Sequence, residues 1–132
     1  MVIRVQTTEK KNDALYVTGV SDIGVIRGKW FYREAPVIDK YYHVELGLEA
    51  VDRKDVSVVK ECEQGFESCI RIDSDKMIFQ AFCEEYDETY ILRIDGGLEM
   101  LEICNDDGTI HEGDVICFQQ ACETLGIYPY EL

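Results

Sequence analysis

The chain of 132 residues carries 13 Lys/Arg against 27 Asp/Glu, a formal net charge of −14 at neutral pH. Its length suits one domain, residues 1–132, and its eight Tyr and five Phe supply burial that disordered chains lack. No apolar run approaches the roughly 20 residues needed to cross a bilayer, and the N-terminus lacks the apolar region of a signal peptide. We therefore expect a folded cytoplasmic protein without membrane contact.

The acidic charge is concentrated in the second part of the chain. Residues 1–60 hold ten Lys/Arg and nine Asp/Glu, whereas residues 61–132 hold three and eighteen. Crowding like charges works against a compact state. This asymmetry therefore favours a role in solubility or in binding a basic partner.

Period-two alternation of apolar residues dominates the chain and predicts strands. The clearest case places Tyr42, Val44, Leu46 and Leu48 on one face. In chain order, the predicted strands span residues 2–6, 14–20, 24–32, 41–49, 56–62, 67–73, 77–84, 89–94 and 98–104. Turn-forming residues separate them at 11–13, 64–65, 73–75, 95–97 and 105–108.

One helix is predicted near the end of the chain, with a weaker signal near 48–56. Asp114 has the chemistry of an N-cap and Gly126 that of a helix stop. One helical face between them would carry Val115, Phe118, Cys122 and Leu125. The expected fold class is mainly β (α+β): a curved antiparallel sheet or partial barrel, largely a meander, with the C-terminal helix packed on it.

Six cysteines without a CxxC pair need an interpretation that suits a reducing compartment. They are Cys62, Cys69, Cys83, Cys104, Cys117 and Cys122. In the cytosol thiols stay reduced, and a free cysteine packs as a small hydrophobe. We expect no disulfide framework.

Alternating turns of an antiparallel meander over 56–104 would gather carboxylates at one end of the sheet, in an acidic rim. Two tyrosines there would serve as anchors, because aromatic residues carry much of the energy of interfaces. The predicted partner-binding residues are Glu61, Glu63, Glu67, Glu84, Glu85, Tyr86, Asp87, Glu88, Tyr90, Asp106 and Asp107.

Catalytic and metal-binding motifs are missing from the sequence, so we expect no enzyme, metal or cofactor. Two alternatives remain. His43 and Glu45 share one face of a predicted strand and would form a general acid–base pair. A small-ligand carrier would instead close its strands around an apolar cavity, with Tyr42, Phe79 and Tyr90 pointing inward.

Direct nucleic-acid binding is disfavoured, because phosphates would meet a repulsive field. Carboxylates can instead imitate phosphates in the active site of a basic nuclease. A small acidic chain with the loop 84–88 and no catalytic motif resembles bacterial immunity proteins, such as those of contact-dependent growth inhibition. The resemblance implies an inhibitor that binds and neutralises a cognate basic protein toxin, as a monomer or weak homo-oligomer.

Overall fold

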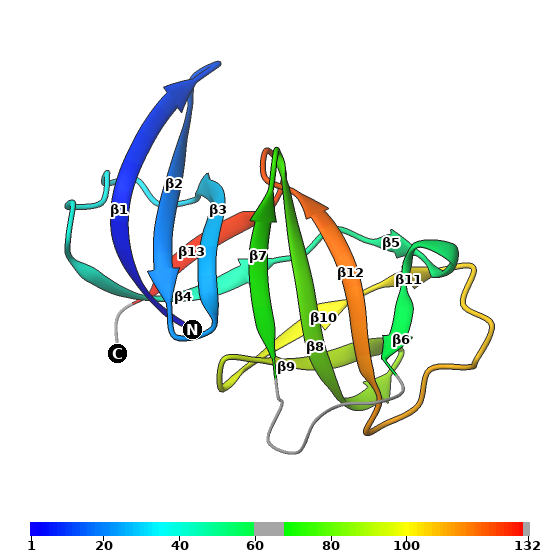
Figure 1. Cartoon of the computed structure of the whole chain (residues 1–132). Coiled ribbons are helices and arrows are strands. Elements are labelled where there is room, and N and C mark those ends of the chain that lie inside the picture. Colours follow the sequence, from blue (N-terminus) through cyan, green and yellow to red (C-terminus); the bar gives the residue numbers. More distant parts are fainter. Residues whose placement is uncertain (60–67, 131–132) are drawn as a thin grey trace.

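The computed structural model describes residues 1–59 and 68–130, and almost all of its regular structure is strand (Figure 1). Five strands close into a barrel in the order β1-β2-β3-β13-β4. They are β1 (Val2–Lys11), β2 (Ala14–Ser21), β3 (Gly24–Trp30), β4 (Tyr41–Gly47) and β13 (Gly126–Tyr130).

A tight turn joins the first two strands of the barrel, and the last strand of the chain closes it. Asn12 and Asp13 both adopt positive φ, of 50° and 62°, in the tight turn between β1 and β2. The last strand, β13, then inserts between β3 and β4, parallel to β3 and antiparallel to β4. The barrel therefore needs residues from both ends of the sequence.

Residues 48–125 form an insertion between β4 and β13, and most of it is a second sheet in the order β10-β9-β8-β12-β6, with β7 also paired to β8. Its strands are β6 (Ser57–Val59), β7 (Cys69–Asp73), β8 (Lys76–Asp87), β9 (Thr89–Ile94), β10 (Gly97–Leu101) and β12 (Val115–Ala121). A small parallel pair joins β5 (Val51–Asp52) to β11 (Ile103–Cys104), and a 3-10 helix, η1 (Arg53–Asp55), follows β5.

One apolar core runs through the barrel and the second sheet. Ile3, Val17 and Ile127 fill the barrel, while Phe79 and Phe118 stack between β8 and β12 with ring centroids 5.2 Å apart. Each of these side chains is at most 1% exposed, so alternate residues of each strand supply the core.

Among the contacts that join the two parts of the fold, three involve close backbone approach or buried polar groups. At Gly24, φ is +141° and an added Cβ would lie 2.1 Å from the carbonyl oxygen of Ile70 in β7. Buried Glu99 of β10 accepts a hydrogen bond from the Leu46 N–H of β4. Buried Gln120 of β12 bonds the backbone of Glu49, just after β4. Close backbone approach and buried polar bonds therefore fix the insertion on the barrel.

The predicted C-terminal helix is wrong, and with it the α+β class. Residues 115–121 form β12, which pairs with β8 along its whole length. The cause is that Ile116, Phe118 and Gln120 are buried on alternate positions, so the period is two and not 3.6. Gln120 conceals this period in the sequence because a polar residue stands at a core position.

The residues expected to cap this helix have other roles. The Asp114 carboxylate accepts the His111 N–H at 2.8 Å within a turn. Gly126 belongs to β13, where an added Cβ would lie 2.6 Å from a ring carbon of Tyr128. Near 48–56, only the three residues of η1 are helical.

The antiparallel sheet is confirmed, and β7 to β10 form the expected meander. At its start the prediction fails, because β6 pairs with β12 instead of continuing into the meander. Within the described residues, no helix is long and apolar enough to span a membrane. Cys83 and Cys122 are buried thiols, whereas Cys104 is exposed.

Candidate functional site

The β8–β9 hairpin carries the acidic loop 84–88 at the edge of the molecule. The pairing register of β8 and β9 shifts between Cys83 and Glu85, and Glu88 turns the chain with a φ of 63°. Tyr86 and Tyr90 face each other across the hairpin, with ring centroids 4.8 Å apart. Tyr86 is 55% exposed and Tyr90 only 3%, so Tyr86 alone presents an open ring.

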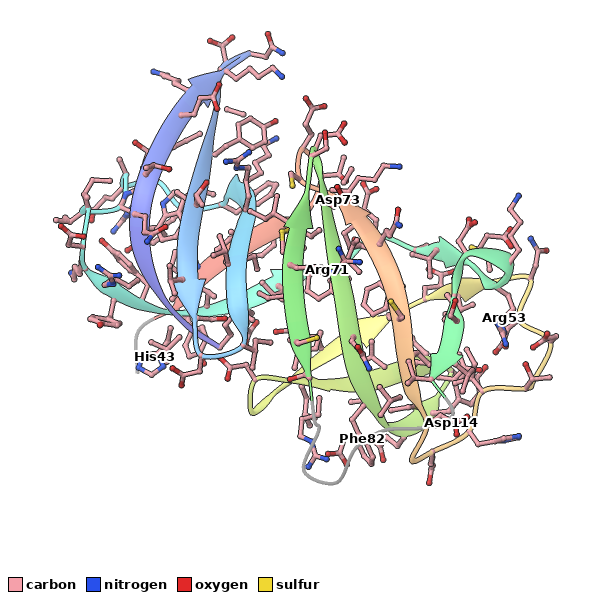
Figure 2. The ribbon with its side chains drawn as sticks, in the orientation of Figure 1. His43, Arg53, Arg71, Asp73, Phe82 and Asp114 are labelled. Carbon is pink, nitrogen blue, oxygen red and sulfur yellow. The ribbon has the colours of Figure 1, made fainter. Side chains whose placement is uncertain are left out.

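The loop 105–114 is bonded to this hairpin. The Tyr90 hydroxyl donates to the Asp106 carboxylate at 2.5 Å. The Gly113 N–H donates to the Cys83 carbonyl, and the Cys83 N–H donates to the Asp114 carbonyl, both at 2.8 Å. Figure 2 shows Phe82 and Asp114 at one end of the second sheet and Asp73 at the opposite end. The hairpin and the loop therefore form one surface.

A hollow of about 520 Å³ lies between the hairpin and the loop. Its lining residues are Tyr86, Tyr90, Asp106, Gly108, Ile110, His111 and Glu112. An exposed ring, a small apolar floor and carboxylates at the margin suit the end of a cationic side chain, which an aromatic face and a carboxylate both attract.

Two of the predicted rim carboxylates are neutralised within the chain. Glu84 pairs with Arg93 at 3.1 Å, and Arg93 also lies over the Phe82 ring. Asp107 pairs with Arg53 at 3.1 Å, and hydrogen bonds from Thr109, reinforced by Arg53, lower the pKa of Asp107. These carboxylates stabilise the insertion and are poorly placed for a partner.

Other carboxylates of this surface keep their charge uncompensated. Glu85, Asp87, Glu88 and Glu112 are exposed, and no cation of residues 1–59 or 68–130 lies within ion-pair distance of them. Asp106 is exposed, and among the described residues its carboxylate accepts from the Tyr90 hydroxyl and the Gly108 N–H alone. We name the set Glu85, Tyr86, Asp87, Glu88, Asp106 and Glu112, with its hollow, the hairpin site.

Tyr90 has a different role from the predicted one. Burial, and then its bond to Asp106, raises the pKa of Tyr90, so the hydroxyl stays protonated and keeps donating. It holds the loop 105–114 against the hairpin and is not itself open to a partner.

The structure brings together Glu85, Tyr86, Asp87, Glu88 and Asp106 of the predicted rim. Glu61, Glu63 and Glu67 lie outside the described residues. The sequence reasoning missed Ile110, His111 and Glu112, because residues before Asp114 were assigned to the approach of a helix. The turn residues Asn105, Gly108 and Gly113, all at positive φ, were the signal of a folded loop there.

The two alternative sites receive little support from the geometry. His43 and Glu45 are exposed on the outer face of β4, and the His43 ring lies 5.9 Å from that of Tyr130. The barrel interior is filled by buried aliphatic side chains, while Phe79 and Tyr90 belong to the second sheet.

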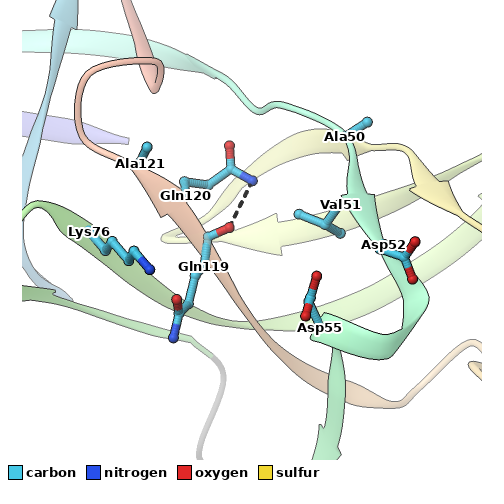
Figure 3. Close-up of a pocket in the computed structure, with 8 residues that line it drawn as sticks. All are labelled: Ala50, Val51, Asp52, Asp55, Lys76, Gln119, Gln120 and Ala121. Carbon is cyan, nitrogen blue, oxygen red and sulfur yellow. Dashed lines mark hydrogen bonds between the residues drawn. The ribbon is translucent and has the colours of Figure 1, made fainter.

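A second hollow, of about 460 Å³, lies beside β12 and the segment 50–55 (Figure 3). Lys76 and Asp55 line it, and the Gln120 amide donates to the Gln119 carbonyl at 3.2 Å (Figure 3). Gln120 is occupied by structural bonds, and Asp52 caps η1 through the Lys54 N–H. In the described part of the chain, no three His, Cys, Asp or Glu side chains are grouped as a metal site would need.

Comparisons of the chain with protein families, with curated proteins and with solved structures find no match. The chemistry of the hairpin site is therefore the basis for a functional proposal.

Proposed function

We propose that this protein is an immunity-type inhibitor that binds and neutralises a basic protein toxin, such as a nuclease, through the hairpin site. The observation that carries the proposal is the exposed ring of Tyr86, set beside a hollow among uncompensated carboxylates. An isolated exposed aromatic residue is ordinary, but one at the centre of a charged surface has the form of an interface anchor.

The charge distribution over the fold supports this proposal. Residues 1–47 and 126–130, which hold the barrel, carry seven Lys/Arg and six Asp/Glu. Residues 48–125 carry six Lys/Arg and twenty Asp/Glu. The negative field therefore comes from the insertion, which also carries the hairpin site.

Two physical effects would act in sequence during binding. The negative field of the insertion would steer a basic partner and raise its association rate, which electrostatics can change by roughly ten- to a thousand-fold. Tyr86 would then pack on the partner and slow dissociation. On a nuclease, the carboxylates of the hairpin would occupy positions that substrate phosphates take during catalysis.

The test uses the protein encoded beside this one in its genome as the partner. Glu85→Gln, Asp87→Asn and Glu88→Gln together should lower the association rate at least about ten-fold at low salt and flatten its salt dependence. The matched control changes the same number of exposed carboxylates away from the site: Glu9→Gln, Asp13→Asn and Asp73→Asn. Association and dissociation rates are measured by surface plasmon resonance between roughly 20 and 300 mM NaCl, a range over which the screening length shortens about four-fold.

The variant Tyr86→Ala distinguishes the packing of the Tyr86 ring on the partner from the long-range electrostatic attraction. We expect a dissociation rate at least about ten-fold higher with an association rate near that of the native protein. If the hairpin triple variant and the control triple variant bind with the same rates and salt dependence, the proposal is wrong.

A further inference from the structure

Strand β10 reverses the usual placement of apolar and charged side chains. In an antiparallel sheet with one solvated face, apolar residues normally face the core and polar residues face water. Glu99 of β10 is 7% exposed, whereas its neighbours Leu98 and Met100 are 62% and 67% exposed. The two apolar side chains therefore add little to the core. Departures of this kind from the local pattern are expected at functional sites.

Cross-strand pairing places Met100 beside the acidic loop of the hairpin. Met100 of β10 is paired with Ile91 of β9, and Ile91 is paired with Glu85 of β8. Paired residues lie on the same face of a sheet, and the next position of β8 on that face is Asp87. In the described part of the chain, no cation lies within ion-pair distance of Glu85 or Asp87. A partner that packs on Met100 therefore also meets two uncompensated carboxylates.

The protein covers an aromatic ring of this face with its own arginine and leaves the aliphatic side chains open. The Arg93 guanidinium lies 4.5 Å from the centre of the Phe82 ring and pairs with Glu84 at 3.1 Å. Leu98 is paired with Arg93 in the same row, yet it remains exposed. Protein interfaces have an apolar centre and a polar margin, and this face has both. We name Ile91, Leu98 and Met100 the β10 strip.

Tyr86 lies on the opposite face of the same hairpin, because successive residues of a strand point to opposite sides. It is paired with Tyr90, which faces the core. A partner in contact with both Tyr86 and Met100 must therefore enclose the hairpin from two sides. A cleft has this shape and a flat surface does not.

We propose that the β10 strip is the apolar part of the toxin interface, and that the hairpin enters a cleft of the toxin with basic residues and one apolar wall. This inference rests on the proposed function. Carboxylates attract basic proteins in general, whereas packing on the strip needs an apolar surface of matching shape. The strip therefore selects the cognate toxin among basic proteins.

Met100 makes this contact measurable without a substitution. The chain has three methionines, and the other two, Met1 and Met77, are 7% and 0% exposed. Hydrogen peroxide should therefore oxidise Met100 first in the free protein, and mass spectrometry follows the sulfoxide. In the complex with the protein encoded beside this one, we expect oxidation of Met100 to slow about ten-fold or more. Equal rates in the free protein and in the complex would overturn the proposal.

The double variant Leu98→Gln and Met100→Gln tests the strip by binding rates. It makes the strip polar at similar side-chain size, so dissociation should be about ten-fold faster or more, with an association rate and salt dependence near those of the native protein. The matched control is Val37→Gln with Ile38→Gln, an apolar pair of the barrel connection that is 59% and 47% exposed. We expect this control to bind as the native protein does.

The hairpin triple variant tests the proposed function and leaves the β10 strip intact, so the two results are read separately. If the triple variant binds weakly but the Leu98 and Met100 double variant dissociates as slowly as the native protein, this inference alone is wrong. If the native protein does not bind the neighbouring gene product, the proposed function and this inference are both wrong.

Discussion

Glu99 is a carboxyl group placed where the barrel meets the insertion. It is 7% exposed, and its acceptor bond from the Leu46 N–H measures 3.1 Å. Burial raises its pKa to about 7, against an ordinary value of 4.5, with the negative charge of Glu45 adding to the rise. The Leu46 bond and the Met1 ammonium oppose the rise. The folded state therefore holds a proton on Glu99 that the unfolded state releases at lower pH.

This proton makes stability depend on pH. Between pH 4.5 and about 7 the folded state binds more protons at Glu99 than the unfolded state, so the free energy of unfolding falls as pH rises through that window. The full effect is roughly 3 kcal/mol. Glu99→Gln keeps an acceptor for the Leu46 N–H and cannot ionise, so we expect it to remove this slope and to exceed the native stability at pH 8.

Urea unfolding at several pH values between 4 and 8 measures this difference. Glu102→Gln is the control, because Glu102 is an exposed carboxylate three residues further along the chain. Parallel pH curves for native protein and Glu99→Gln would contradict the assignment.

At the scale of elements, β12 shows how one polar side chain can replace a strand partner. The Gln120 side chain accepts the Glu49 N–H at 2.7 Å and donates to the Glu49 carbonyl at 3.0 Å. It thus makes both bonds that a neighbouring residue in a sheet would make. This pair ties β12 to the segment that leaves β4.

Gln120→Leu keeps the side-chain size and removes both bonds. Because the Glu49 backbone groups then lose their partners, we expect a loss of about 1–3 kcal/mol in the free energy of unfolding. Gln119→Leu changes the same residue type at the exposed neighbouring position, and we expect a change within about 0.5 kcal/mol. Chemical denaturation of both variants provides the comparison, and equal losses would show that the Gln120 bonds add nothing.

At the scale of the whole molecule, the net charge of −14 resides on the insertion. Repulsion among exposed carboxylates destabilises the compact state, and salt screens it over about 10 Å at 0.1 M and 3 Å at 1 M. The three carboxylates of the hairpin loop, Glu85, Asp87 and Glu88, contribute to this repulsion because no described cation pairs with them.

We therefore expect Tm to rise when NaCl increases from roughly 0.01 to 0.5 M, a range over which the screening length shortens several-fold. The triple variant Glu85→Gln, Asp87→Asn and Glu88→Gln should be more stable than the native protein at low salt and should gain less from added salt. Differential scanning calorimetry measures both effects. A lower Tm of this variant at low salt would contradict the prediction, because it would mean that the loop carboxylates stabilise the folded state.

The sequence by itself determined most strands and tight turns. Alternation of apolar and polar residues predicted β2, β3, β4, β7 and β9 nearly to their ends. The two faces of a strand differ in burial, and this difference is visible in the residue types of a short stretch of sequence. Turns such as Asn12-Asp13 and Asp95-Gly96 were equally local, since those residues tolerate positive φ. The concentration of acid in the second part of the chain was also visible without a structure.

Only the tertiary structure decided which pairs meet over long separations. Residues 115–121 form a strand because β8 pairs with them and because Gln120 finds its partner 71 positions away, at Glu49. Arg53 forms an ion pair with Asp107, which lies 54 positions away in the sequence. Such pairings show which carboxylates stabilise the fold and which remain unpaired at the surface. These outcomes depend on chain closure and mutual burial, and local residue patterns contain neither.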